Sequence, residues 1–311
     1  MISVIVSSYN AANFNNLARS IEHTIGDVLF EIIKVENHGE FGLCAAYNLG
    51  AKQARYPILC FVHEDVIFKT ENWGTKVRHH FESIPNLGLL GVAGGSYKSF
   101  VPSGWATKAY PENFIHAQII QSKKDKTERE TFVCGMTDKV FAETVTVDGV
   151  CFFTLKAIVT ESPFDEETFR GFHCYDLDFS LAVGLHRKVV VCFDILLEHF
   201  SKGNFDYKWL GETIKFQRKW ASILPRSAGH PLSQDAISYI EATEFYNYVR
   251  MVLYNNGSLK TVTDIYFADR FKTLVGVKRW MLIPVFIFAW IIPRFVAGRV
   301  VTFFRTKKIN G

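Results

Sequence analysis

Three polar residues, His63, Glu64 and Asp65, directly follow the apolar run 58–62. Side chains on an extended chain point alternately to its two sides, so His63 and Asp65 share one side and Glu64 takes the other. Imidazole and carboxylate groups are both ligands of divalent cations. The pattern predicts a polar site where a buried strand ends, and the elements around that strand must position it.

The first third of the chain alternates short apolar runs with helical patterns, which is typical of βαβ units around a parallel sheet. The expected strands are Ile2–Ser7, Phe30–Glu36, Pro57–His63 and Leu87–Ala93, and the expected helices are Ala12–Thr24, Gly42–Ala54 and Asn72–Ser83. The carboxyl ends of such strands face one crevice, where open α/β sheets bind their ligands. Three polar segments fall at these ends: Ser7-Ser8-Tyr9-Asn10, Glu36-Asn37 and His63-Glu64-Asp65.

The middle of the chain is less regular. Lys98 to Asp138 lacks apolar periodicity and holds Pro102, Pro111 and the charged run 123–126, so we expect a long loop there. We interpret Phe132–Val150 as irregular strands, Tyr175–His186 as a helix and Lys188–Glu198 as a buried strand, with mainly helices after Lys202. The predicted organisation is one α/β domain at residues 1–204, a helical extension at 205–275 and a basic hydrophobic tail at 276–311.

The charge is distributed unevenly along the chain. The net charge is +4, but residues 276–311 hold seven Lys and Arg and no acid, which leaves −3 for the body. Basic charge confined to a hydrophobic terminus favours an anionic membrane surface as partner, and the body has no basic patch for nucleic acid.

The tail contains a continuous apolar run, Trp280–Ile292. This run is shorter than the roughly 20 residues of a spanning helix, so we favour an interfacial or re-entrant helix. A span from Trp280 to Phe304, or a helix packed on the body or a second copy, are the alternatives.

The six cysteines form no Cys-x-x-Cys pair and lie mostly in apolar runs, so we expect buried, reduced thiols. Met1 leads directly into the first predicted strand, without a charged segment before a longer apolar stretch. We therefore expect no signal peptide and a cytoplasmic protein, peripheral on the inner face of the cell membrane.

Neither G-x-G-x-x-G after the first strand nor G-x-x-x-x-G-K-[ST] occurs, which excludes dinucleotide dehydrogenases and P-loop enzymes. What remains at the strand ends is polar and acidic. Six segments in order carry a resemblance: Ile2–Asn10, Val35-Glu36-Asn37, Ala45–Gly50, His63-Glu64-Asp65, Tyr175-Asp176-Leu177-Asp178 and His199. They resemble the opening strand, second-strand acid, following helix, D-x-D position, E-D-x-D-like segment and late histidine of inverting family 2 glycosyltransferases.

The resemblance implies a GT-A (Rossmann-like) fold, a mostly parallel α/β sheet flanked by helices with a helical C-terminal extension. It also implies a UDP- or dTDP-linked sugar donor, a Mn²⁺ or Mg²⁺ ion, inversion, and a glycan or lipid-linked acceptor. Asp65, His199 and His63 would hold the metal, and Asp176 would be the general base. The nucleotide-sugar contacts would be Ser8, Tyr9, Glu36, Asn37, Asn48, Glu64, Gly149 and His173.

His63 stands where the family pattern has its first Asp. One carboxylate is lost, which should weaken metal binding or favour Mn²⁺, because imidazole is a softer ligand. The departure leaves open a non-catalytic protein that binds a nucleotide sugar or a partner. A sugar nucleotidyltransferase is the other alternative, but residues 7–10 lack the Gly-rich, Arg- and Lys-bearing loop of that class.

Several of these residues also have ordinary structural explanations. Acids in the first turn of a helix, such as Asp176, are favoured by capping and by the helix dipole alone. Glu36 suits a cap of the next element, and a lone histidine at a strand end, such as His199, is commonly a surface or core residue.

Overall fold

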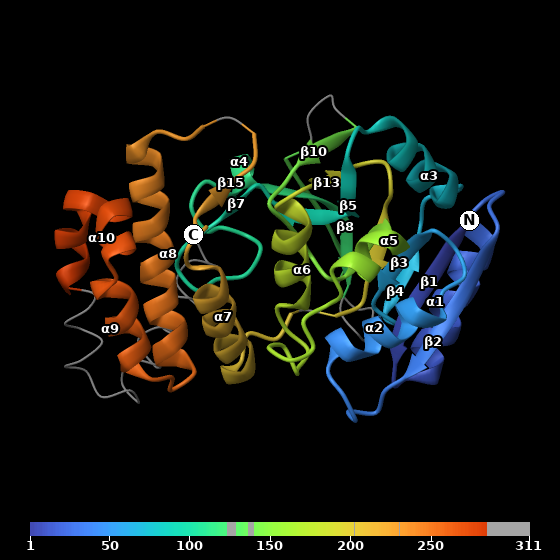
Figure 1. Cartoon of the computed structure of the whole chain (residues 1–311), viewed down its shortest axis with the longest axis horizontal. Helices are drawn as coiled ribbons and strands as arrows, with labels where there is room; N and C mark the ends of the chain where they lie inside the picture. Colours follow the sequence, from blue (N-terminus) through green and yellow to red (C-terminus); the bar gives the residue numbers. More distant parts are fainter. Residues whose placement is uncertain (123–128, 136–139, 202, 230, 285–311) are drawn as a thin grey trace. The chain divides into compact units, whose positions relative to one another are not determined.

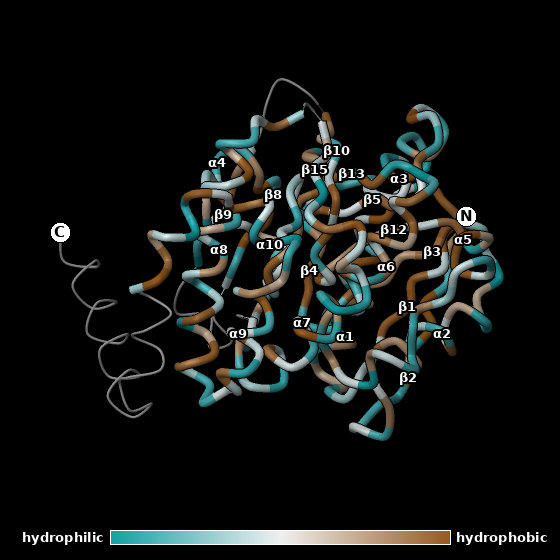
Figure 2. Tube along the Cα trace, turned by 60° about the vertical axis from the view of Figure 1, so that its left-hand side comes forward, coloured by the Kyte–Doolittle hydropathy of each residue, from teal (hydrophilic) through white to brown (hydrophobic). Residues whose placement is uncertain are grey.

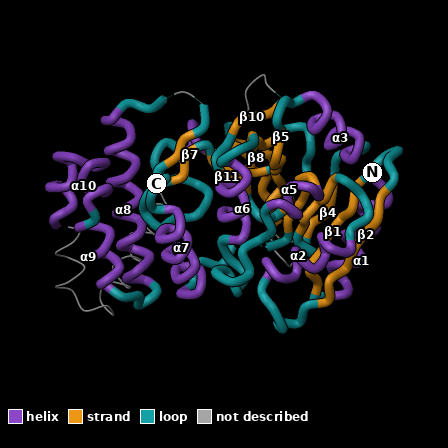
Figure 3. The backbone as a smooth tube through the Cα atoms, in the orientation of Figure 1, coloured by secondary structure: helices purple, strands orange, loops and turns teal. Residues whose placement is uncertain are grey.

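The computed structural model describes residues 1–122, 129–135, 140–201, 203–229 and 231–284. The chain forms two compact units. Unit 1 comprises Met1–Tyr97, Glu112–Gly203 and Ser227–Gly229, and unit 2 comprises Lys98–Pro111, Asn204–Arg226 and His230–Gly311. Figure 3 shows most strands in unit 1 and mainly helices in unit 2.

Unit 1 alternates strands and helices in its first third, as predicted. Its strands are β1 (Ile2–Ser8), β2 (Phe30–Glu36), β3 (Ile58–Val62), β4 (Val66–Phe68), β5 (Leu87–Gly91), β6 (Ala93–Gly95), β8 (Ile115–Ser122), β9 (Arg129–Cys134), β10 (Phe141–Glu143), β11 (Thr146–Val147), β12 (Cys151–Leu155), β13 (Lys188–Cys192) and β14 (Leu197–His199). Its helices are α1 (Ala11–Thr24), α2 (Leu43–Gln53), α3 (Trp73–Ser83), α4 (Pro111–Phe114), α5 (Lys156–Glu161) and α6 (Tyr175–Gly184). The short strands β7 (Tyr97–Lys98) and β15 (Arg226–Ser227) lie where the chain passes between units.

The larger sheet has the order β10-β13-β5-β12-β3-β1-β2 (Figure 1). β1 pairs in parallel with both β2 and β3, and β5 with β13, whereas β12 runs antiparallel to its neighbours β3 and β5. The strands β2, β1, β3, β5 and β13 therefore share one direction, and β12 and β10 oppose it. β2 and β3 lie on opposite sides of β1, so the carboxyl end of β1 is a switch point where open sheets bind ligands.

The second sheet has the order β11-β6-β8-β14-β4, and β9 pairs with β8. β14 lies between β4, to which it is antiparallel, and β8, to which it is parallel. This pairing sets His199 opposite Val66 on one side and opposite Gln121 on the other. A residue late in the chain is thereby held beside the segment that follows β3.

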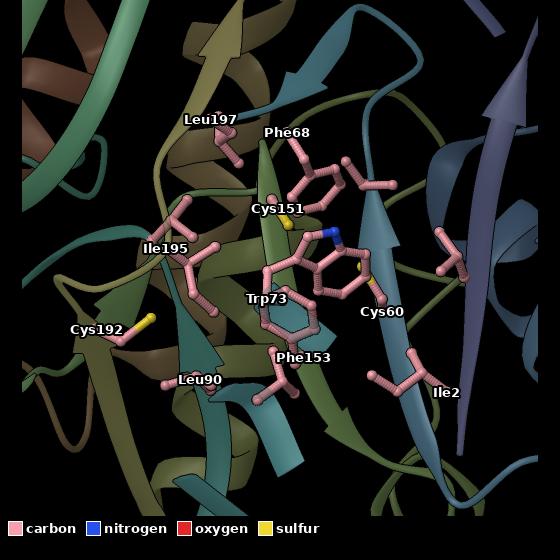
Figure 4. Packing of buried hydrophobic residues seen from close by; sticks show 14 of the residues in the cluster. Ile2, Cys60, Phe68, Trp73, Leu90, Cys151, Phe153, Cys192, Ile195 and Leu197 are labelled. Carbon is pink, nitrogen blue, oxygen red and sulfur yellow. The ribbon is translucent and has the colours of Figure 1, made fainter. Parts of the chain in front are cut away.

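The hydrophobic core of unit 1 follows the alternation of its strands. Residues 2, 4 and 6 of β1 and 58, 60 and 62 of β3 pack on one face with α1 and α3. Figure 4 shows Trp73 packed between Phe68 and Phe153. Its ring stacks on Phe68 with centroids 4.3 Å apart and lies 5.8 Å from the Phe153 ring. Its indole N–H donates to Thr24 Oγ1 at 3.1 Å, so the polar atom of this buried ring is satisfied.

The opposite face of the same sheet is covered by α2 and α6. Tyr47 on α2 lies 4.7 Å from Phe61, and Phe152 lies 6.2 Å from Phe179 on α6, between ring centroids. Figure 2 shows hydrophobic residues along the strands and mixed hydropathy along the helices, consistent with helices that bury one side. The predicted α/β class is confirmed.

Unit 2 contains α7 (Tyr207–Trp220), α8 (Gln234–Tyr254), α9 (Leu259–Phe267), α10 (Asp269–Val275) and the 3₁₀ helix η1 (Gly276–Leu282). Ser233 caps α8 and Ser258 caps α9 through side-chain acceptors for backbone N–H groups. The carboxylates of Glu241 and Glu244 on α8 are buried, and they accept hydrogen bonds from Ser99 Oγ and Thr107 Oγ1. These bonds fasten the 98–111 segment to α8 within the unit.

The prediction of one long loop from Lys98 to Asp138 is wrong in part, because β8 and β9 occupy 115–122 and 129–134. The apolar Ile115, Ala117 and Ile119 alternate with polar residues, as is typical of a strand. The prolines and charged residues around them led to the loop prediction instead. The predicted strand Lys188–Glu198 is two strands, β13 and β14, in different sheets. The charged run 123–126 lies outside the described residues.

Most of the tail's apolar run, from 285 onward, also lies outside the described residues. Among the residues that the structure describes, no helix is both long and apolar enough to span a membrane. The cysteines are free, and all but the half-buried Cys134 are buried.

A matched pair of substitutions tests this account of the core. Phe153 is fully buried against Trp73, whereas Phe172, also in unit 1, is 56% exposed. We expect Phe153→Ala to lower the free energy of unfolding of unit 1 by about 3–5 kcal/mol. Phe172→Ala should change it by less than about 0.5 kcal/mol. Urea unfolding monitored by circular dichroism measures both, and equal losses would contradict the assigned core.

Candidate functional site

Glu64 joins the end of β3 to the end of β1. Its Oε2 accepts hydrogen bonds from Ser8 Oγ at 2.7 Å, Tyr9 N at 3.1 Å and Asn10 N at 3.0 Å. The carboxylate is buried, and its Oε1 makes no hydrogen bond with the described residues. Glu64 thus faces β1, apart from His63 and Asp65 as predicted, but residues 64–65 form a turn and not the extended strand end that the sequence suggested.

The other side carries His63, Asp65 and His199, whose potential ligand atoms all lie within 4.8 Å of one another. His199 Nε2 is 3.5 Å from Asp65 Oδ1, and this nitrogen is buried without a hydrogen-bond partner among the described residues. A buried acceptor nitrogen beside a carboxylate oxygen and a second imidazole fits a divalent cation of borderline softness. The three residues predicted as ligands thus converge, and metal binding itself stays a prediction.

The electrostatics of this cluster also suit a cation. Burial, helped by nearby His199, lowers the pKa of His63 to about 4, so the ring is neutral at pH 7, as a ligand must be. Burial acts to raise the pKa of Asp65, but the nearby His199 and His63 rings outweigh it and hold that pKa below its usual value. Asp65 is therefore ionised at neutral pH.

A hydrogen-bonded chain leads from His63 to Asp176. The hydroxyl of Tyr175 lies 2.8 Å from His63 Nε2 and donates to Gly149 O at 3.0 Å, and Gly149 N donates to Asp176 Oδ2 at 2.9 Å. A Cβ on Gly149 would lie 1.9 Å from the Tyr175 hydroxyl, so only glycine fits there. Tyr175 makes this close approach, and the predicted contact of Gly149 with the donor sugar stays a prediction.

Asp176 lies in the first turn of α6, where the helix dipole lowers a carboxylate pKa. Burial and the nearby Asp148 nevertheless raise its pKa to about 7, against backbone hydrogen bonds from Leu177 and Gly149. A carboxylate with this pKa accepts a proton readily at neutral pH. The local environment thus removes the objection that a helix N-terminus makes Asp176 too weak a base.

The residues predicted to contact the nucleotide differ in their exposure and in the bonds that they already make within the protein. Tyr9 is 64% exposed at the end of β1, and Glu36 is an exposed acid that pairs with Lys34 at 2.6 Å. Asn37 is bound to Ser7 Oγ and Phe41 O through its side-chain amide. All three lie at the ends of β1 and β2, where Ser8 is in register with Glu36.

Asn48 has a structural role in the described fold. Its amide donates to Phe164 O and Glu166 Oε2 and accepts from Phe164 N, so both of its donors are occupied. His173 is half-buried next to the exposed Phe172, with ring centroids 5.5 Å apart. The roles of Asn48 and His173 in binding a nucleotide sugar stay predictions.

Three residues that touch the site were not predicted from the sequence. Tyr175 orients His63, Phe172 lies 5.4 Å from the His63 ring, and Gln121 contacts His199. Tyr175 belongs to the recognised segment Tyr175–Asp178 and Phe172 lies just before it, so proximity along the chain was an available signal. Gln121 fell within the region predicted as loop, and the alternating pattern of 115–120 was the signal that places it on a strand.

A second cluster of possible ligands lies elsewhere in unit 1, formed by His80, Cys192 and Asp194. His80 Nε2 and Asp194 Oδ1 are 2.9 Å apart, and Lys76 Nζ lies 3.7 Å from Asp194 Oδ2. A nearby lysine and a direct His–Asp hydrogen bond already satisfy this carboxylate. The second cluster is therefore a structural ion pair and serves as an internal control for the first.

A family model and several solved structures are similar to this chain. A family model described as "Glycosyltransferase like family" matches residues 3–210. No curated protein matches the sequence. The structure of S. aureus TarS 1–349 in complex with UDP is similar at 14% identity and a TM-score of 0.52, over 98% of this chain and 91% of that one.

The longer S. aureus TarS structure aligns with 93% of this chain at 13% identity and a TM-score of 0.52, and the chain spans 52% of its length. GalNAc-T7 with UDP, GalNAc and Mn²⁺ aligns at 10% identity and a TM-score of 0.46, over 93% of this chain and 53% of that one. The family match and the shared TarS fold confirm the resemblance predicted from the sequence.

Matched substitutions in the two clusters should affect metal binding differently. We expect Asp65→Ala to weaken Mn²⁺ binding by at least about 100-fold, because losing a ligand costs more than losing an outer hydrogen-bond partner. Asp194→Ala, the same change in the second cluster, should leave the affinity unchanged. Titration calorimetry with MnCl₂ decides between them, and the reverse order of effects would refute the assignment.

Proposed function

The chain belongs to the glycosyltransferase-like family, and from that premise we propose that it transfers a sugar from a nucleoside diphosphate to an acceptor hydroxyl with inversion. The observation that carries the proposal is the convergence of His63, Asp65 and His199, together with the link from His63 through Tyr175 and Gly149 to Asp176. A charge-binding group and a base of raised pKa are the two components that this displacement needs.

UDP is the nucleotide that the proposal favours, since the similar TarS fold was solved in complex with UDP. Tyr9 and Glu36 would contact the base and ribose from the ends of β1 and β2, and Ser8, which is fully buried and donates to Glu64, would act through that carboxylate. Glu64 Oε1 supports this arrangement, because a buried carboxylate oxygen without a partner among the described residues calls for a donor such as a ribose hydroxyl. A dTDP-linked donor is the alternative that the family resemblance leaves open.

His63, Asp65 and His199 would hold a divalent cation, with Mn²⁺ favoured over Mg²⁺ by the two imidazoles. When bound, the cation neutralises negative charge on the leaving diphosphate. The protein's own contribution is to keep His63 neutral and Asp65 ionised without side-chain rearrangement. Such preorganised charge is a principal source of catalysis in group transfer.

Asp176 would act on the acceptor. As the acceptor oxygen forms its bond to the anomeric carbon, the bond from that carbon to the diphosphate oxygen breaks, and the acceptor proton passes to the Asp176 carboxylate. Hydrogen bonds from Gly149 N to Oδ2 and from Leu177 N to Oδ1 fix the orientation of this carboxylate. Attack opposite the leaving group inverts the anomeric centre.

The pKa of Asp176 predicts the pH dependence. A base works in its ionised form, so kcat should rise as pH increases through about 7, the pKa of Asp176, and then level off. Asp176→Asn should lower kcat by about 10²–10⁴-fold, the usual contribution of a general base. The UDP affinity should be unchanged. Transfer rates from pH 5.5 to 8.5 with Mn²⁺ and UDP-sugars measure the profile.

An Asp176→Asn variant that keeps both the rate and the pH profile would exclude this base. Tight binding of UDP and Mn²⁺ without turnover of any donor would instead favour a non-catalytic binding protein. His63 in place of a carboxylate is the observation that favours that second function.

We also propose that the C-terminal segment binds an anionic membrane surface, which would make the acceptor a lipid-linked glycan. Val277, Trp280 and Met281 of unit 2 are 83%, 73% and 74% exposed. Seven Lys and Arg accompany them within residues 276–311. Exposed apolar side chains beside cations are typical of interfacial helices, whose affinity combines apolar burial with attraction to acidic lipids.

The exposed side chains give this membrane proposal a direct test. The double substitution Trp280→Ser and Met281→Ser should weaken binding to phosphatidylserine-containing vesicles at least about tenfold, since each buried side chain contributes about 1.5 kcal/mol or more. Tyr254→Ser, at a side chain of unit 2 that is 57% exposed, should have no effect. Vesicle sedimentation measures both effects. Equal binding by the wild type, the double variant and Tyr254→Ser would contradict the proposal.

A further inference from the structure

Gln121, on β8, contacts one predicted metal ligand without belonging to the ligand set. Its side-chain amide donates from Nε2 to His199 O at 3.1 Å and to Ser201 O. Its Oε1 faces His199 Nδ1 at 3.4 Å. The parallel pairing of β8 with β14 sets Gln121 directly opposite His199, so the contact is fixed by the sheet.

The two carbonyl acceptors determine the orientation of this amide. Only the NH₂ group can donate to His199 O and Ser201 O, because the flipped amide would set three oxygen atoms against one another. Oε1 must then face the His199 ring. An amide oxygen can only accept, so His199 Nδ1 carries the proton of the neutral ring and Nε2 carries the lone pair.

The nitrogen left with the lone pair is the one that faces the cluster. His199 Nε2 lies 3.5 Å from Asp65 Oδ1 and is buried without a partner among the described residues. In the opposite tautomer Nε2 would carry a proton and donate it to Asp65, which closes the site to a cation. The contact with Gln121 therefore favours the tautomer of His199 that can bind a cation over the tautomer that would donate to Asp65.

The backbone around His199 limits any other response of the ring. β14 is paired with β4 on one side and with β8 on the other, and Phe200 N donates to Asp65 O at 3.0 Å. On the same strand, Glu198 is anchored by Lys69 at 2.8 Å and by Ser122 Oγ at 2.6 Å. These contacts fix the main chain at His199 beside Asp65 and Gln121.

We propose that Gln121 is a positioning residue that fixes the Nδ1-protonated tautomer of His199 and so presents Nε2 to a divalent cation at Asp65 and His63. The identity of the ligand rests on the proposed function, but the tautomer is a property of the metal-free protein. Gln121 touches neither the cation nor the substrate, and it acts only through His199.

Nitrogen NMR of the metal-free protein tests the tautomer directly. In ¹⁵N-labelled protein at pH 7.5, we expect His199 to show a protonated Nδ1 and an unprotonated Nε2, with the signal assigned by its loss in His199→Asn. In Gln121→Met the Nε2-protonated form should appear. A wild-type His199 protonated at Nε2 would overturn the proposal, whether or not the protein binds metal.

Two substitutions separate the tautomer role from a purely structural one. Gln121→Met loses both the acceptor for Nδ1–H and the donors to the two carbonyls, whereas Gln121→Glu keeps an acceptor but sets a carboxylate oxygen against the two carbonyls, which disturbs the backbone more. Mn²⁺ affinity, measured with MnCl₂ alone by titration calorimetry, should fall about 10–100-fold in Gln121→Met and by less in Gln121→Glu. Equal losses in both would show that Gln121 only holds the backbone, against the proposal.

Gln118→Met is the matched control, since Gln118 lies on the same strand and contacts neither His199 nor Asp65 by any hydrogen bond in the described residues. It should keep the wild-type Mn²⁺ affinity, and thermal unfolding should confirm that all the variants are folded. A wild-type protein that binds no Mn²⁺ would overturn the metal part of the proposed function. The NMR result would still decide the role of Gln121.

Discussion

The bond network of Glu64 is the constraint on which the site depends. One carboxylate oxygen accepts from Ser8 Oγ, Tyr9 N and Asn10 N, so the chain after β3 is held against the end of β1. Residues 64–65 form a turn between β3 and β4, and with Glu64 anchored to β1 the side chains of His63 and Asp65 lie together with His199. Charge-assisted bonds to a buried carboxylate are strong, and losing one partner leaves an unsatisfied buried charge.

The surroundings of Asp65 and Asp176 shift the pKa values of these two acids in opposite directions. Asp65 lies beside two imidazoles and has a lowered pKa, whereas Asp176 lies beside Asp148 in a buried position and has a raised one. Neighbouring acids whose environments separate their pKa values commonly divide charge binding from proton transfer. Tyr175 and Gly149 link His63, which lies beside Asp65, to Asp176 through hydrogen bonds.

Much of this could be predicted from the sequence because it depends on local patterns. The βαβ alternation placed β1, β2, β3 and β5 closely, and the order of the motifs brought His63, Asp65, His199 and Asp176 to one region. The loop prediction for 98–138 failed because β8 is stabilised by pairing with β6, β9 and β14, which are distant in sequence. The raised pKa of Asp176 depends on Asp148 and on burial, which no local pattern reveals. For Asn48, the sequence suggested a nucleotide contact, but its side-chain amide donates to residues 164 and 166. These residues lie far from Asn48 in the sequence, so no local pattern indicated the bonds.

The central claim is that one cation and one nucleoside diphosphate meet at the strand ends that Glu64 joins. A crystal grown with UDP and Mn²⁺ and measured at the manganese absorption edge tests it most directly. The account predicts an anomalous peak within bonding distance of His63, Asp65 and His199, with the diphosphate against it and the ribose beside Glu64. A peak at another position, or UDP bound away from the ends of β1 and β3, would contradict it.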